Sequence, residues 1–127
     1  MLTDEQLLAW WRLRRLPGIG NIAVNRIRLQ LDDPAQLFCS TVEQLIDFGL
    51  TPHAAKNWQQ QDSLSHGFEV LQHWRQQPDC DVLLAGVSPY PDNLSALPDA
   101  PILLYARGNL AALEQPCIAM VGSRNPS

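Results

Sequence analysis

The placement of proline is the feature that most restricts how this 127-residue chain can fold. Seven of the ten prolines fall at or after residue 78, whereas all four tryptophans precede that position. Proline removes a backbone donor and breaks a helix interior, so the second part cannot hold long helices. The shift predicts a helical N-terminal region and an irregular, strand-containing remainder, with a boundary at about 77–80.

Helix start and stop signals subdivide the first part. Thr3 with Gln6 and Thr41 with Gln44 fit the capping-box pattern, in which each side chain binds the other residue's backbone amide. The remaining helices are expected over about 21–31, from Asp33-Pro34, from Thr51-Pro52, and over about 62–77 with Gly67 in its interior. These signals predict an all-helical region from residue 3 to residue 77.

Three short apolar segments in the second part predict strands, at 82–85, 102–106 and 117–121. The last segment, CIAMV, is a continuous apolar run, typical of a strand buried on both faces of a parallel sheet. Such a strand needs neighbouring strands and a covering helix. Because neither follows, we interpret residue 127 as the boundary of an expressed or cleaved piece. The expected class is an α+β fragment with units at 1–78 and 79–127.

Composition and charge exclude several classes of protein. No apolar run reaches the roughly 18 residues that cross a bilayer, and the N-terminus carries acids where a signal peptide carries positive charge. We therefore expect a soluble, cytoplasmic protein without membrane contact. The net charge is −4, but residues 1–31 hold five arginines against two acids, a balance of +3, and the remainder carries −7. Contact with an anion is therefore expected near the N-terminus or at an isolated arginine.

Neither a disulfide framework nor a metal site is indicated. Cys39, Cys80 and Cys117 are far apart and odd in number, so we expect buried, reduced thiols. His66 and His73 share a helix face at a spacing of seven, which is too long for both to bind one ion. We expect no metal, no cofactor and no catalytic residue. The tryptophans at positions 10, 11 and 58 have helical spacings that favour core packing over base stacking.

The segment LPGIGNIAVNRI, residues 16–27, fits a helix-hairpin-helix pattern. Gly18 and Gly20 permit a tight turn, Ile19 fills the gap between the helices, and amides at the next helix N-terminus can bind a phosphate. Arg26 and Arg28 lie within reach on that second helix. Hairpins of this kind grip the DNA backbone without reading sequence. The alternative is a tight helix–helix turn inside a sterile-alpha-motif-like bundle.

A second candidate site is formed by Gly122, Ser123 and Arg124, directly after the apolar run. Glycine permits close backbone approach, the serine hydroxyl and following amides can bind phosphate oxygens, and arginine supplies a bidentate fork. The segment is not the G-x-G-x-x-G dinucleotide fingerprint. A plain exit from a strand into a loop is the alternative.

Three segments together resemble the DNA-processing protein A family, also called DprA or Smf. They are LPGIG, PILLYARGNLAAL at 101–113, and CIAMVGSRNPS at 117–127. The RGNL step followed by an apolar strand and GSR is more specific than the hairpin. One departure is visible, because the stretch VSPYPDNLSALPDAP lacks the acid that usually precedes the tyrosine in this family.

The resemblance implies a non-enzymatic protein that binds and protects single-stranded DNA and helps load RecA recombinase during natural transformation. It also implies a sterile-alpha-motif-like domain followed by the first strands of an extended Rossmann-type domain that dimerises. Gly122, Ser123 and Arg124 are the residues here that match a DNA-binding motif of the family. The rest of that pocket and the homodimer interface are expected beyond residue 127.

Two other function classes remain open from the sequence. A Rossmann-like nucleotide phosphoribohydrolase also places a phosphate-binding loop after its first strand, and an Arg- and Glu-rich catalytic motif downstream would distinguish it. Alternatively, residues 1–77 form a protein-interaction module without DNA affinity of its own, and its hairpin is purely structural.

Overall fold

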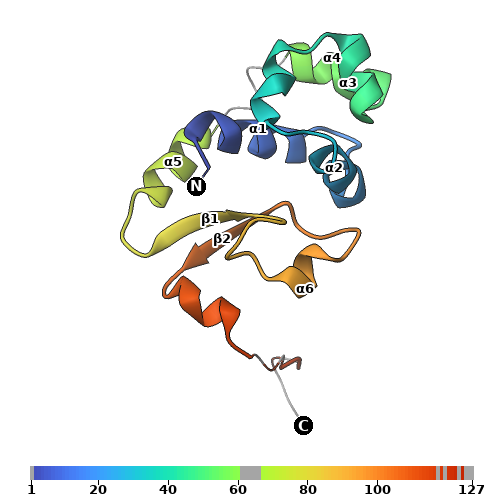
Figure 1. Ribbon diagram of the computed structural model, residues 1–127. Helices are drawn as coiled ribbons and strands as arrows, with labels where there is room; N and C mark the ends of the chain where they lie inside the picture. Colours follow the sequence, from blue (N-terminus) through green and yellow to red (C-terminus); the bar gives the residue numbers. More distant parts are fainter. Residues whose placement is uncertain (1, 61–66, 117, 119, 123, 125–127) are drawn as a thin grey trace.

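The computed structural model describes residues 2–60, 67–116, 118, 120–122 and 124 (Figure 1). The helices before the sheet are α1 (Asp4–Arg14), α2 (Asn21–Arg28), the 3₁₀ helix η1 (Pro34–Cys39), α3 (Val42–Phe48), α4 (Pro52–Gln60) and α5 (Phe68–Arg75). The strands are β1 (Cys80–Leu84) and β2 (Leu103–Arg107), with α6 (Asp92–Ser95) between them and the 3₁₀ helix η3 (Leu110–Glu114) after them. The α+β class is confirmed, and strand begins at Cys80 among the described residues.

Capping side chains fix the starts of the helices as the sequence predicts. Both capping boxes form, with Thr3 and Gln6 at α1 and Thr41 and Gln44 at α3. The η1 helix begins where Asp33 accepts from the Ala35 amide at 3.0 Å, and α4 begins where Thr51 accepts from the Ala54 amide at 3.1 Å. The α3 helix ends at Gly49, whose φ of 119° is left-handed and favours glycine.

Gly67 was expected inside the last helix, and this expectation is wrong. Gly67 is the residue before α5 and has a left-handed φ of 87°, which is not the conformation of a helix interior. The first part of the predicted helix, 61–66, lies outside the described residues. Phe68 is buried, and Leu71 and Trp74 pack against the core as the predicted apolar stripe requires.

β1 and β2 form a two-stranded antiparallel sheet. Its register runs from Cys80 opposite Arg107 to Leu84 opposite Leu103, so both strands lie within two residues of their predicted positions. In Figure 1, α1 and α5 lie along one side of the sheet, and α3 and α4 lie beyond α1.

The predicted strand at 117–121 is not present at the residues of this segment that the structure describes. Ile118, Met120 and Val121 lie in no strand, and their exposed fractions are 92%, 93% and 98%. Cys117 and Ala119 lie outside the described residues. A strand is stabilised by hydrogen bonds to a neighbour, and in the described part of the chain β1 and β2 pair with each other. The buried parallel strand predicted from the apolar run is therefore wrong for these residues.

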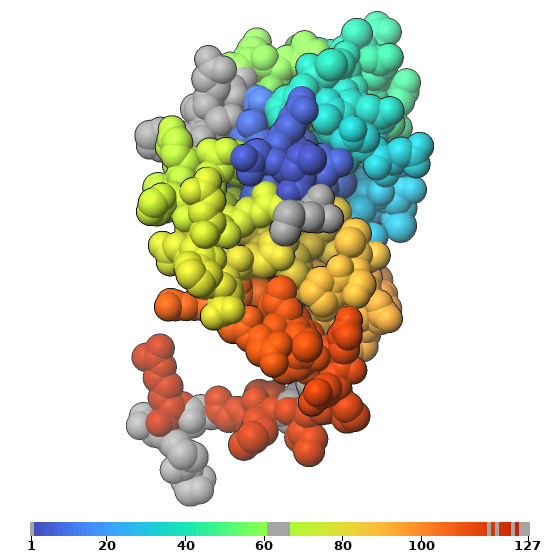
Figure 2. Space-filling view, turned by 60° about the vertical axis from the view of Figure 1, so that its left-hand side comes forward, coloured from blue at the N-terminus to red at the C-terminus, as the bar shows by residue number. Residues whose placement is uncertain are grey.

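One hydrophobic core extends from the helices into the sheet region. Its fully buried side chains include Leu7, Leu13 and Ile27 of the helices and Ile102 beside β2. Trp10 and Trp58 are 2% and 3% exposed, which confirms the prediction that they pack in the core. Figure 2 shows the residues of α5 in yellow-green lying against the orange segment that contains β2.

Polar contacts add to this packing. Arg75 of α5 forms ion pairs with Asp4 at 3.4 Å and with Asp81 of β1 at 3.8 Å, and it donates to the Leu2 carbonyl. Buried Asn25 of α2 donates from Nδ2 to the Ala100 carbonyl at 2.7 Å. Two helices are thereby tied to the strand region at separate points.

None of the helices that the structure describes is both long enough and apolar enough to cross a membrane.

Candidate nucleic-acid interface

The segment 16–27 forms a tight turn between α1 and α2. Gly18 has a left-handed φ of 79°, which a side chain would strain, and the space around it is open. Ile19 is half-buried and packs against the core, as expected for the residue that fills the gap between the two helices. Gly20 precedes α2 in an extended conformation and has no side chain to cap the first amides of that helix. The local geometry is compatible with a phosphate contact and with a bundle turn.

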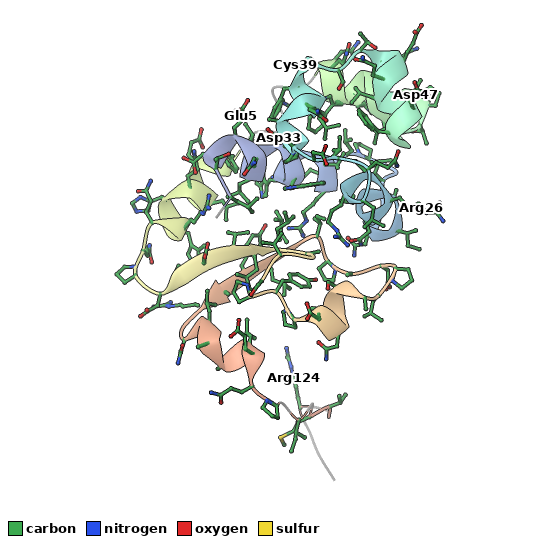
Figure 3. All side chains as sticks on the ribbon, viewed as in Figure 1. Glu5, Arg26, Asp33, Cys39, Asp47 and Arg124 are labelled. Carbon is green, nitrogen blue, oxygen red and sulfur yellow. The ribbon has the colours of Figure 1, made fainter. Side chains whose placement is uncertain are left out.

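The two arginines of this segment lie in different surroundings. Arg26 is exposed and extends away from the molecule (Figure 3). Arg28 donates from Nε to Asn25 Oδ1 at 3.3 Å, and its Nη1 lies 2.5 Å from the position a Cβ would take on Gly86. The guanidinium of Arg28 therefore packs against the loop that follows β1, and Arg26 is the arginine of the pair that projects into solvent.

The loop that receives Arg28 also holds a buried tyrosine. The Tyr90 hydroxyl donates to the Pro101 carbonyl at 2.7 Å, and the side chain is 2% exposed. Burial raises the pKa of Tyr90 above its ordinary value, and the positive charge of Arg28 lowers it in part. The stretch that departs from the family pattern is thus well packed around its tyrosine.

The second candidate site lies on the extended segment after η3. Gly122 and Arg124 are exposed, and Ser123 lies outside the described residues. Figure 3 shows Arg124 on the C-terminal segment, well separated from Arg26 on α2. The two arginines do not converge, so the hairpin and the C-terminal segment are separate candidate contacts.

The RGNL step has a structural explanation. Gly108 has a left-handed φ of 119°, and its amide donates to the Asp79 carbonyl at 2.8 Å. Asn109 caps η3 by accepting from the Ala111 amide at 3.1 Å. Together these residues turn the chain out of β2 and start the next helix. The RGNL step therefore defines the path of the chain between β2 and η3.

The cysteine and histidine side chains form no cluster in the described residues. Cys39 is exposed, which corrects the expectation that it is buried, because η1 presents this position to solvent. Cys80 is a half-buried thiol, and Cys117 lies outside the described residues. His73 is exposed, and His66 also lies outside the described residues. No group of three or more potential metal ligands occurs within the part of the chain that the structure describes.

Sequence reasoning missed one cluster. Arg14, near the end of α1, donates from Nη1 to the Tyr105 hydroxyl at 2.9 Å, and its guanidinium carbon lies 5.8 Å from the centre of that ring. Trp74 of α5 meets Tyr105 edge-on, with ring centroids 6.0 Å apart and planes at 74°. The period-two pattern of β2 was the available signal, because it places Tyr105 and Arg107 on one face. We refer to these residues as the Arg14–Tyr105–Trp74 cluster.

Comparison with known proteins gives one match. Residues 81–127 match a family model described as DNA recombination-mediator protein A. Searches of the curated proteins and of the solved structures each gave no match. The matched range contains the segments 101–113 and 117–127, two of the three that carry the sequence resemblance, and the LPGIG segment lies outside it. Residues 81–127 of this chain are therefore similar to the DNA recombination-mediator protein A family.

Proposed function

We propose that this chain binds single-stranded DNA during recombination and acts without catalysing a reaction. The observation that carries the proposal is the family match over 81–127, which includes Gly122, Ser123 and Arg124. The exposed Arg124, two residues after Gly122 in the chain, offers one charge-assisted contact to a phosphate. The match supports a role in DNA recombination, and the polarity of the segment favours contact with the DNA backbone over reading of bases.

We further propose that the chain protects the bound strand in the cytoplasm and passes it to RecA recombinase during natural transformation. Residues 1–78 act as a sterile-alpha-motif-like domain with a helix-hairpin-helix turn. Residues 79–127 begin an extended Rossmann-type domain that dimerises. The helical turn around Gly18 and the exposed Arg26 support a second, weaker backbone contact from the first of these domains.

The charge distribution limits the affinity of residues 1–127. Single-strand binding needs a basic groove with stacking aromatics, whereas this chain carries −4 overall and −7 after residue 31. We expect it to bind an unstructured oligonucleotide no tighter than about 10⁻⁴ to 10⁻⁶ M at physiological salt, the range typical of non-specific binding. Sub-micromolar affinity that Gly18→Val or Arg26→Ala abolishes would instead make the hairpin the principal site.

Arg124→Ala tests the C-terminal contact. Loss of one phosphate contact should weaken binding to a fluorescein-labelled oligothymidine, measured by anisotropy at low salt, and lower the salt slope by roughly 0.7. Lys56→Ala is the control, because it removes one exposed positive charge on α4 and should leave the slope unchanged. If Arg124→Ala binds with wild-type affinity and salt dependence, the assignment of Arg124 is wrong.

A further inference from the structure

The Arg14–Tyr105–Trp74 cluster presents an aromatic ring at the surface of the molecule. Tyr105 is 49% exposed, although most large apolar side chains of the sheet region are buried. Its hydroxyl accepts a hydrogen bond from Arg14, whose guanidinium lies over the ring, and Trp74 makes a T-shaped contact with the same ring. The exposed half of the side chain is the surface open to a ligand. An exposed aromatic held by neighbours on two sides loses little conformational freedom when a ligand stacks on it.

Positive charge flanks this ring. Arg14 is exposed, and no carboxylate in the described residues forms an ion pair with it. Arg75, which is nearby on α5, differs because Asp4 and Asp81 pair with it. Arg107 lies two residues beyond Tyr105 on the same face of β2, about 6.7 Å along the strand. Arg14 therefore contacts the tyrosine directly, and a second arginine lies two residues along the same strand.

Acidic residues decide which arginine has the stronger attraction for an anion. Asp79 lies beside the Arg107 end of the sheet, where its carbonyl accepts from the Gly108 amide. Its carboxylate lowers the attraction for anions at that end. At the end of α1, Arg14 forms no ion pair with a carboxylate of the described residues, and its guanidinium donates to the Tyr105 hydroxyl. The phosphate contact is accordingly assigned to Arg14.

We propose that the Arg14–Tyr105–Trp74 cluster is a second contact site for single-stranded nucleic acid. In this site a base stacks on the exposed Tyr105 ring, and Arg14 contacts the adjacent phosphate. Stacking aromatics combined with backbone-tracking positive charge are the two components of sequence-independent single-strand binding. The site is distinct from the GSR segment, and it rests on the proposed handling of single-stranded DNA by this chain.

The cluster also joins α1 and α5 to β2, so a structural role must be separated from a binding role. Tyr105→Phe removes the hydrogen bond to Arg14 and keeps the ring, whereas Tyr105→Leu keeps apolar bulk beside Trp74 and removes the stacking surface. A binding site predicts that Tyr105→Leu weakens affinity for oligothymidine at least about fivefold at low salt. Tyr105→Phe should bind within about twofold of wild type. A purely structural cluster predicts equal binding by both variants once circular dichroism shows that they are folded.

Arg14→Ala tests the phosphate contact, with Lys56→Ala as the charge-matched control on α4. Arg14→Ala should lower the salt slope by roughly 0.7, and Lys56→Ala should not change it. A second experiment tests the site in the wild-type chain, without any substitution. An oligothymidine that carries 5-iododeoxyuridine is crosslinked to the chain by ultraviolet light. Mass spectrometry should place the crosslink in the peptide that contains Tyr105 or Trp74.

The outcomes separate this site from the proposed function. If the wild-type chain shows no binding at low salt, the proposed function and the site fail together. If it binds, but the crosslinks lie elsewhere and Tyr105→Leu and Arg14→Ala bind normally, the site alone is overturned.

Discussion

Arg28 follows Arg26 by two residues on α2, yet the two side chains have different neighbours. Helical spacing predicts which face of α2 a residue occupies, and it placed both arginines near the Gly18 turn. It does not predict that a loop nearly sixty positions later packs against Arg28. Gly86, with a left-handed φ of 83°, brings the loop close to the Arg28 guanidinium. A local motif therefore suggested two phosphate contacts where tertiary packing leaves Arg26 as the exposed one.

The same loop gives a pH-dependent prediction at Tyr90. Because its folded-state pKa is raised by burial, folding favours the neutral phenol. This stabilisation is fully present below the unfolded pKa of about 10 and is lost as pH rises through the folded pKa. Urea unfolding of the wild type should therefore show stability falling above about pH 10, and Tyr90→Phe should fall less steeply. Equal pH dependence in both proteins would show that Tyr90 ionisation is not coupled to folding.

At the scale of single elements, helix starts were the most predictable feature. The Thr41–Gln44 capping box satisfies two amides with side chains only three residues apart, so no distant contact is needed to form it. We predict that Thr41→Ala costs about 1 kcal/mol of unfolding free energy, measured in urea. Thr41→Ser keeps the hydroxyl and is the matched control. If both variants lose the same unfolding free energy, the effect comes from the threonine methyl group and not from the cap.

Elements that depend on distant partners were predicted less well. The apolar runs located β1 and β2 within two residues, but they do not specify how the strands pair, and the connecting helix α6 was not predicted. The apolar run at 117–121 has the composition of a buried strand, and composition cannot supply the neighbour that a strand needs. In the candidate sites, glycine turns were recognised because they are local. The Arg14–Tyr105 contact was missed because 91 positions separate the two residues.

At the scale of the whole molecule, the expected units 1–78 and 79–127 share packing. The core cluster contains Trp10 and Leu13 of α1 together with Leu83 of β1 and Ile102 beside β2. Asn25 and Arg75 add hydrogen bonds and ion pairs across the same boundary. The division at 77–80 stays a prediction about domain organisation. Because the two units share a core, whether they unfold independently can be tested. Two independent units would unfold separately, whereas a common core favours one transition.

Tryptophan fluorescence provides the test, because all four tryptophans precede residue 78. Ile102→Ala removes a fully buried side chain from the second unit and should cost about 2–5 kcal/mol. If the two regions unfold together, the urea midpoint reported by the tryptophans falls, although the substitution lies outside the unit that contains them. Leu97→Ala is the control, since Leu97 is 49% exposed and its loss creates no cavity. An unchanged tryptophan midpoint in Ile102→Ala, together with lost hydrogen-exchange protection in β1 and β2, would establish two independent folding units. It would also imply that the Arg14–Tyr105 contact joins parts that can move apart.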